Sequence, residues 1–235
     1  MASDRAVVRE WGEAGGRPLL FWPGLNPAGG WQLPEVGPLL ADRGFHVLAI
    51  VPPGAGGTPP LDARRDYGPR RLADLVVDVA DGHGVDRFVY MGHSWGGSIG
   101  AHLGARHPSR LDGIVLLDGG HVDIKVPRVL RRVLVERFER RYRDGIVEPD
   151  GDRAASSRAA AWALHGLMSE PPSKIHDRIA VPVLLLVPVH AAASEDVRRF
   201  LEAVPHAVVE GVDSGHDIPG DAPEELVAFV CDWLG

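Results

Sequence analysis

Short apolar runs recur along the chain and alternate with stretches in which apolar residues return every three or four positions. The apolar runs, which favour buried strands, lie at 6–11, 18–22, 46–51, 88–91, 113–117, 181–187 and 207–210. The stretches with helical spacing lie at 33–43, 67–80, 97–103, 194–203 and 222–234. Strands that alternate with helices at such short intervals predict an α/β fold with a doubly wound, mainly parallel sheet.

This alternation stops after Gly120 and resumes near residue 178. The intervening residues 121–177 have a helical pattern and contain no convincing strand, which indicates an insertion. We therefore expect an α/β core formed by residues 1–120 and 178–235, with a short helical cap of residues 121–177 over the strand ends.

Seven arginines crowd the first part of this cap, between residues 128 and 143. Apolar residues recur among them every three to four positions, which predicts an amphipathic helix with a basic outer face. A solvated face is one interpretation, and attraction of anionic substrates or of a membrane surface is the other. A second apolar stretch contains Trp162, His165 and Met168. These are candidates to line a substrate pocket or the seam between cap and core.

Composition narrows the classes of function. The formal net charge is −7 at pH 7, which does not favour a nucleic-acid partner. The single cysteine, Cys231, excludes a disulfide within the chain and a thiolate metal cluster. No apolar run reaches membrane-spanning length and no cleavable signal peptide is visible after Met1, so we expect a cytoplasmic protein without stable membrane insertion. A length of 235 residues suits one domain, as a monomer or a homodimer.

The strongest chemical signal is Gly92-His-Ser-Trp-Gly96, which lies between an apolar run and a helix of small residues. A strand that turns sharply into a helix through Gly-x-Ser-x-Gly is a nucleophile elbow. Glycine at both ends of the motif suits a turn where a Cβ would collide with neighbouring backbone. The hydroxyl of Ser94 would then stand above the sheet edge. The N–H of Trp95 would point from the helix N-terminus toward an oxyanion formed there.

Four motifs, taken in this order, resemble those of the α/β-hydrolase superfamily. They are Phe21-Trp-Pro-Gly-Leu-Asn26, Pro52-Pro-Gly-Ala-Gly56, Gly92-His-Ser-Trp-Gly96 and Asp213-Ser-Gly-His216. The resemblance covers the chain from about Arg17 onward, apart from the cap, and it implies the α/β-hydrolase fold.

The oxyanion loop of that family usually begins His-Gly, whereas here it begins Pro23-Gly24. The donor in the family is the backbone N–H after that glycine, so Leu25 can still serve. The resemblance therefore implies an oxyanion hole formed by Leu25 and Trp95. Asn26, next in the same loop, is a candidate pocket residue.

A serine hydroxyl needs a base that removes its proton during attack. Of the eleven histidines, His216 lies in a Gly-containing loop after the last strand, where the family places its catalytic histidine. His93 adjoins Ser94 in sequence, but successive side chains of a strand point to opposite faces, so we expect His93 to be turned away. His216 is therefore the candidate base.

That histidine in turn needs a carboxylate to hold its tautomer and stabilise the imidazolium. Many family members carry the acid three residues past a glycine that ends the strand corresponding to 183–187, and here that position is Ala191. Some members, zearalenone-type lactonases among them, hold the acid at the end of the preceding strand. In this chain that position is Asp118.

We therefore predict Asp118 as the acid, in the order Ser94, Asp118, His216 along the chain. Glu195 and Asp196 remain alternatives, although both also suit the first turn of a helix, where carboxylates complement the helix dipole.

Together these residues predict a serine hydrolase that cleaves a carboxylic ester, lactone or thioester in a small-molecule substrate through an acyl-enzyme. Serine rather than aspartate at the elbow argues, within the family, against haloalkane dehalogenase and epoxide hydrolase chemistry. Carbon–carbon bond hydrolysis, amide cleavage and acyl transfer stay open, as does a receptor that keeps the triad and turns over slowly. No cluster of His, Asp and Glu has metal-ligand spacing, so we expect neither a metal nor another cofactor.

Overall fold

The structure is a computed structural model that describes residues 7–25, 33–56, 58–145 and 153–235. Its strands are β1 (Val7–Trp11), β2 (Arg17–Trp22), β3 (Phe45–Val51), β4 (Phe88–His93), β5 (Leu111–Leu117), β6 (Val183–Pro188) and β7 (Val208–Val212). Its α-helices are α1 (Val36–Ala41), α2 (Pro69–Gly82), α3 (Trp95–Arg106), α4 (Arg128–Gly145), α5 (Arg153–Ser169), α6 (Glu195–Ala203), α7 (Ile218–Asp221) and α8 (Pro223–Leu234). Short 3-10 segments are η2 (Arg64–Tyr67), η3 (Pro108–Arg110), η4 (Pro172–Lys174), η5 (His176–Arg178) and η6 (Val189–Ala191).

The strands form one seven-stranded sheet in the order β1-β3-β2-β4-β5-β6-β7. β1 runs antiparallel to β3, and the other neighbouring pairs are parallel. The predicted doubly wound, mainly parallel sheet is therefore confirmed. The chain order turns back between β2 and β4, and in open α/β sheets such a switch point is where ligands bind, at the carboxyl ends of the strands.

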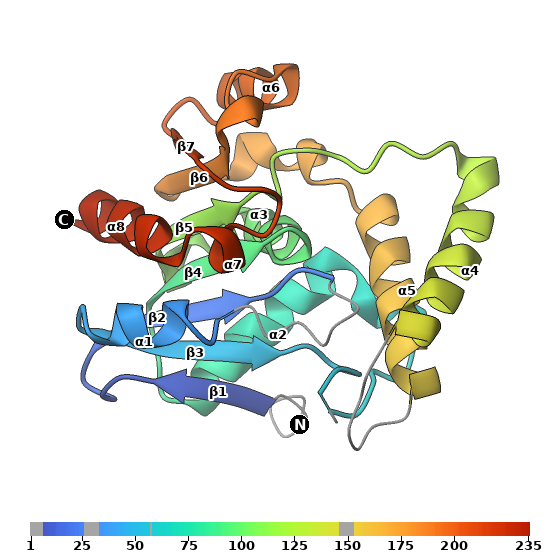
Figure 1. The fold of residues 1–235 in the computed structure, drawn as a ribbon, viewed down its shortest axis with the longest axis horizontal. Coiled ribbons are helices and arrows are strands. Elements are labelled where there is room, and N and C mark those ends of the chain that lie inside the picture. The colour runs from blue at the N-terminus through green and yellow to red at the C-terminus, as the bar shows by residue number, and fades with distance from the viewer. Residues whose placement is uncertain (1–6, 26–32, 57, 146–152) are drawn as a thin grey trace.

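Helices cover both faces of the sheet (Figure 1). Because alternate side chains of a strand point to opposite faces, each strand contributes to two cores. From β4, Phe88 and Tyr90 pack in the core that contains buried residues of α2, α3 and α6. Val89 and Met91 pack in the second core, with residues of α1 and α8. The central strands have to be apolar throughout because both of their faces are buried.

The described part of residues 121–177 lies between β5 and β6 and contains helices but no strand. α4 and α5 stand side by side at the right of Figure 1, beyond the carboxyl ends of the parallel strands. This arrangement is compatible with a cap, and the division of the chain into core and cap stays a prediction.

Most of the apolar residues in the first half of α4 are exposed. Val129 is 83% exposed, and Leu130 is 53% exposed. Of the apolar residues that recur along this helix, Phe138 and Tyr142 do pack, in a small cluster with Ala160 of α5. Helical spacing specifies a face, but burial also needs an element opposite that face, and the packed cluster lies in the second half of α4.

Among the helices that the structure describes, none combines the length and the apolar character needed to cross a membrane.

Candidate active site

Ser94 is the single residue between β4 and α3, at the turn that joins them. Its backbone has φ 51° and ψ −104°, a conformation that L-residues rarely adopt. The backbone N–H of Ser94 donates to the carbonyl of Leu117 in β5 at 2.9 Å, which continues the parallel ladder up to the turn. The side chain is therefore presented at the carboxyl edge of the sheet by a backbone that is held in place.

Two glycines make this turn sterically feasible. A Cβ on Gly96 would lie 2.1 Å from the carbonyl oxygen of Trp22 in β2, and a Cβ on Gly119 would lie 2.2 Å from the carbonyl oxygen of Ser94. Both distances are far below van der Waals contact, so only glycine lets the two neighbouring strand ends approach the elbow so closely. The turn after β5 is thus packed directly on the turn after β4.

His216 lies in the loop between β7 and α7. Two contacts hold this loop: the N–H of Gly215 donates to Asp221 Oδ2 at 2.8 Å, and His93 Nε2 donates to the carbonyl of His216 at 2.6 Å. The imidazole of His216 is exposed, with 60% of its side-chain surface accessible to solvent. A held backbone with an open imidazole is suited to exchanging protons with a bound molecule.

Asp118 follows β5 directly and, like Ser94, has a positive φ, of 41°. Its N–H donates to the carbonyl of Leu186 in β6 at 2.8 Å. The following residues are also held, since His176 Nε2 donates to the carbonyl of Gly120 at 2.7 Å. The Asp118 carboxylate is consequently fixed at the same edge of the sheet as the Ser94 hydroxyl, on the neighbouring strand.

These three side chains form one hydrogen-bonded line. His216 Nδ1 donates to Asp118 Oδ2 at 2.6 Å, and the Ser94 hydroxyl donates to His216 Nε2 at 3.0 Å. The hydrogen bond to Asp118 raises the pKa of His216, and burial acts against this effect. The arrangement pairs a hydroxyl with a base and the base with a carboxylate that orients it.

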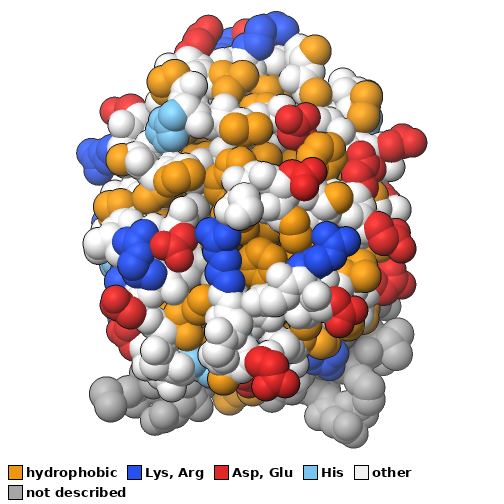
Figure 2. Space-filling model, turned by 90° about the vertical axis from the view of Figure 1, so that its left-hand side faces the viewer, with side chains coloured by type: hydrophobic (Ala, Val, Ile, Leu, Met, Phe, Trp, Pro, Cys, Tyr) orange, Lys and Arg blue, Asp and Glu red, His pale blue; other side chains and the backbone are white. Residues whose placement is uncertain are grey.

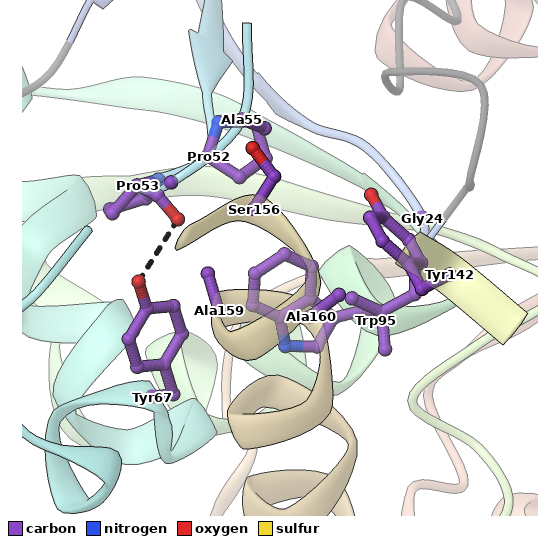
Figure 3. Close-up of a pocket in the computed structure, with 12 residues that line it drawn as sticks. Gly24, Pro52, Pro53, Ala55, Tyr67, Trp95, Tyr142, Ser156, Ala159 and Ala160 are labelled. Carbon is purple, nitrogen blue, oxygen red and sulfur yellow. Dashed lines mark hydrogen bonds between the residues drawn. The ribbon is translucent and has the colours of Figure 1, made fainter. Parts of the chain in front are cut away.

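A narrow cavity borders the elbow (Figure 3). Its lining includes Gly24, Leu25, Trp95 and Tyr142, together with small residues of α5. Its volume is about 20 Å³, room for about one water molecule. A Cβ on Gly24 would lie 3.2 Å from Ser94 Cβ, so the loop that carries Leu25 passes beside the serine. The structure therefore places both candidate oxyanion-hole residues at this cavity.

The far wall of the cavity is built on Tyr67 and α5. The Tyr67 hydroxyl donates to the carbonyl of Pro53 at 3.1 Å, shown as a dashed line in Figure 3, and this ties η2 to the loop after β3. Burial raises the pKa of Tyr67 to about 12, so the phenol stays protonated and serves as a hydrogen-bond donor. Ser156, Ala159 and Ala160 complete this wall from α5, so its surface is mostly apolar with one hydroxyl group.

The three candidate pocket residues of α5 lie apart from this cavity. Trp162 and His165 line a larger groove between α4 and α5, and Met168 is buried, with 2% of its surface exposed. Their role as pocket residues stays a prediction. Asn26 lies outside the described residues.

The two alternative acids point elsewhere. Glu195 and Asp196 lie in the first turn of α6, whose N-cap is Ser194. Glu195 forms an ion pair with Arg199 one turn later, and Asp196 forms one with Lys125 at 3.4 Å. Neither carboxylate has a hydrogen bond to His216 among the contacts of the described residues.

The contact between His93 and His216 was not predicted. The two rings lie 4.8 Å apart between centroids, and His93 is buried, with 2% of its surface exposed. Burial lowers the pKa of His93, which favours the neutral ring that donates to the His216 carbonyl. Alternation along β4 predicted that His93 faces away from Ser94, but it contained no signal that a loop more than 120 residues later packs on that face.

Within the described residues, His, Cys, Asp and Glu side chains do not gather in any group of three or more that could hold a metal ion.

The sheet order, the turn at Ser94 and the hydrogen-bonded Ser, His and Asp define a class of protein, the α/β hydrolases. Comparison with known proteins leads to the same class. The family described as alpha/beta hydrolase fold matches residues 17–177, and the chain belongs to this family.

Similar proteins span several hydrolase activities. Epoxide hydrolase A of Mycobacterium tuberculosis (strain ATCC 25618 / H37Rv) is 35% identical over 80 residues, which cover 34% of this chain and 25% of that protein. The putative carbamate hydrolase RutD of Caulobacter sp. (strain K31) is 25% identical over 263 residues, which cover 99% of this chain and 92% of that protein. The chain spans about a quarter of the length of the curated epoxide hydrolases it matches.

Solved structures show the same fold. The enol-lactonase from Burkholderia xenovorans LB400 superposes with a TM-score of 0.77 at 20% identity, over 97% of this chain and 96% of that one. The thioesterase domain from the curacin biosynthetic pathway superposes with a TM-score of 0.72 at 17% identity, over 96% and 95% of the two chains. At these identities the likeness concerns the fold alone.

Proposed function

We propose that this chain is a serine hydrolase that cleaves a carboxylic ester, lactone or thioester through an acyl-enzyme on Ser94. The observation that carries the proposal is the hydrogen-bonded line in which His216 Nε2 lies 3.0 Å from Ser94 Oγ and His216 Nδ1 lies 2.6 Å from Asp118 Oδ2. A serine hydroxyl is a poor nucleophile by itself, and this pairing supplies the base that it needs.

The first half of the reaction transfers the acyl group to the protein. As Ser94 Oγ bonds to the carbonyl carbon, its proton passes to His216 Nε2, and Asp118 stabilises the imidazolium. The tetrahedral intermediate then expels the alcohol or thiol, which takes the proton from Nε2, and an ester on Ser94 remains. In the second half a water molecule gives a proton to Nε2 and attacks this ester, so that the acid leaves and Ser94 regains its proton.

The negative charge on the intermediate's oxygen needs donors that are already in position. The N–H of Trp95 is suited to this role because Trp95 is the first residue of α3 and the amide groups at a helix N-terminus favour anions. Leu25 follows Gly24, where an added Cβ would lie 3.2 Å from Ser94 Cβ, so the N–H of Leu25 is the second candidate. Both residues border the cavity beside the elbow.

The size of that cavity favours a substrate with a short acyl group. Its mostly apolar walls and its volume of about 20 Å³ suit a methyl or ethyl group better than a long chain or a charged group. The leaving group would extend toward solvent on the side where His216 is exposed. A small ester, lactone or thioester is therefore the substrate class that the site favours.

The sequence similarity to epoxide hydrolases raises a second chemistry, which the elbow residue disfavours. Within the family, epoxide hydrolysis is associated with an aspartate at the elbow, and this chain has Ser94 there. A serine with a hydrogen bond to His216 is the arrangement expected for acyl transfer to a hydroxyl.

Labelling with a fluorophosphonate probe, followed by a panel of short-chain esters, lactones and thioesters, tests the proposal. We expect the probe to add to the wild-type protein and not to Ser94→Ala, which should also lose hydrolysis while keeping its unfolding midpoint. Ser109→Ala is the matched control and should be labelled like the wild type, because Ser109 is an exposed serine that precedes β5, at the opposite end of that strand from Asp118. Labelling of Ser94→Ala, or hydrolysis by it at the wild-type rate, would show that Ser94 is not the nucleophile. A burst of product followed by almost no turnover would instead favour a receptor.

A further inference from the structure

A groove of about 660 Å³ lies between α4 and α5, and it contains none of the three residues of the proposed triad. Its walls come from α4, α5 and the segment η2 before α2, and they include Arg64, Arg128, Arg131, Trp162 and His165. The volume falls within the range of small-molecule sites, which is roughly 300–1,000 Å³. The groove is therefore large enough for a ligand that the cavity beside Ser94 cannot hold.

The carboxylates at this groove already have partners. Glu136 and Glu139 are the two acidic residues that line it, and Glu136 pairs with Arg132 at 2.8 Å. Glu139 pairs with Arg143 at 3.2 Å. Each pair joins residues one helical turn apart on α4, so these ion pairs neutralise one another along the helix and do not reach across the groove.

Three other arginines that line the groove are outside these ion pairs. Arg64 and Arg128 have no carboxylate partner among the described residues, and Arg131 donates from Nε to the carbonyl of Val126 at 3.2 Å. That bond uses one of the five N–H donors of Arg131 and orients its side chain. The groove thus carries three positive charges whose donors are available to a ligand.

His165 of α5 lines the same groove as Arg64 and Arg131. Burial lowers the pKa of His165, and the charges of Arg64 and Arg131 lower it further. Because Arg64 precedes α2 and Arg131 lies in α4, two distant segments bring their charges to the same part of α5. His165 is kept neutral there, so it can donate or accept a hydrogen bond without adding to the charge.

Trp162 provides an apolar surface beside these cations. Its ring packs against Tyr67 with centroids 5.7 Å apart and an interplanar angle of 66°. This contact holds the indole, which is half buried, at the wall of the groove. A fixed aromatic ring next to arginines suits a ligand that has both a charged and an apolar part.

The arginines of the groove belong to a protein that is acidic as a whole. The chain as a whole has a formal net charge of −7. Figure 2 shows the side opposite α4, where acidic and basic side chains are interspersed among apolar ones. The arginines at the groove therefore contrast with the negative net charge of the chain and with the mixed charges of the opposite side, and they would attract an anion to this place.

We propose that the groove between α4 and α5 binds a small organic anion, whose carboxylate or phosphate group contacts Arg64, Arg128 and Arg131. Guanidinium groups match both anions in geometry because two parallel N–H donors meet two oxygens. The apolar part of the ligand lies on Trp162. This site is separate from the proposed triad, and binding to it is measured without turnover.

Isothermal titration calorimetry with phenyl phosphate, benzoate and benzyl alcohol at millimolar concentration tests this proposal. We expect at least one of the two anions to bind to the wild type and the neutral alcohol not to bind. The anion that binds with the higher affinity shows whether the groove prefers phosphate or carboxylate. Arg128→Gln with Arg131→Gln should weaken binding by about tenfold or more, since each removes a charge-assisted hydrogen bond.

The matched control is Arg140→Gln with Arg141→Gln, which changes the charge of α4 equally at exposed residues outside the groove. It should leave the affinity within about twofold of the wild type, because charges exposed to solvent and not in contact with the ligand contribute little. Absence of binding by both anions, or an equal loss in both double variants, would overturn the proposal. Adsorption of the protein to vesicles of anionic phospholipid that depends on Arg128 and Arg131, without binding of either small anion, would identify a membrane-facing surface in place of a groove site.

Discussion

Ser94 and Asp118 are the two non-glycine residues with positive φ in the described part of the chain, and both follow directly on central strands. Such backbone conformations cost roughly 1–3 kcal/mol each and persist only where the surroundings impose them. Here the surroundings are backbone hydrogen bonds from both residues to the next strand. Strain at two neighbouring strand ends, each bearing a side chain bonded to the same histidine, is the pattern expected of a site selected for its chemistry.

The identity of the acid is tested by substitutions that keep size and remove charge. We expect Asp118→Asn to reduce the acylation rate by on the order of 10⁴-fold, because the imidazolium loses its stabilising partner and its tautomer is no longer enforced. Asp196→Asn and Glu195→Gln, whose carboxylates pair with Lys125 and Arg199, should stay within a few-fold of the wild type. Single-turnover kinetics on the best ester measures all three, and the opposite ranking would assign the acid to the start of α6.

A pH profile tests the role of His216. The base must be neutral to accept the proton, and the hydrogen bond to Asp118 raises its pKa above the usual value of about 6.5. The value of kcat/KM should therefore fall as the pH drops through an apparent pKa above about 6.5, and the rate should be full on the alkaline side. Residual activity of Asp118→Asn should show a lower apparent pKa, since the raising partner is gone. An identical inflection in both proteins would argue against this pairing.

At the scale of elements, the site depends on how closely the ends of β4 and β5 approach each other. The register pairs His93 with Leu117, so Ser94 and Asp118 follow at adjacent ends of one parallel ladder. The loop with His216 reaches the same edge from β7, two strands further on, and is held there by His93 and Asp221. Two members of the site are thus positioned by the sheet itself, and the third by contacts of a loop.

A methyl group on Gly119 should separate these strand ends. We expect Gly119→Ala to lower the free energy of unfolding by about 1–3 kcal/mol, because its Cβ would meet the Ser94 carbonyl oxygen at 2.2 Å. Hydrolysis should fall as well, since the carbonyl that must move belongs to the nucleophile. Urea denaturation compares this variant with Gly15→Ala, where an added Cβ meets nothing within 4 Å. An unfolding midpoint equal to that of the control would show that the turn can widen freely.

On the scale of the whole molecule, the sequence was sufficient for the sheet. Runs such as 183–187 and 113–117 had to be strands because they are apolar on both faces, and the structure buries them on both. The elbow could also be predicted, because a Cβ at Gly92 or Gly96 would collide with neighbouring backbone. The position of Asp118 was reached from the absence of an acid at Ala191 and from the family resemblance, and the structure brings its carboxylate to His216.

The features that could not be predicted from the sequence are those that depend on contacts between distant segments. Local periodicity describes which residues share a face, and it does not say what lies opposite that face. For this reason the exposed apolar residues of α4 and the buried contact of His93 with the His216 loop could not be foreseen. The groove between α4 and α5 could not be foreseen for the same reason, because Arg64 and Arg131 are far apart in the sequence and line one groove only in the folded chain.

The position of Asp118 has a consequence for the segment η6, which lies directly after β6. If the carboxylate is supplied one strand earlier, the turn at Val189–Ala191 has no chemistry to preserve, and Val189 is 59% exposed there. This turn is nevertheless at the carboxyl edge of the sheet, on the strand next to the one that carries Asp118. A new recognition loop could therefore be inserted at η6, which lies close to the proposed triad and carries none of its residues.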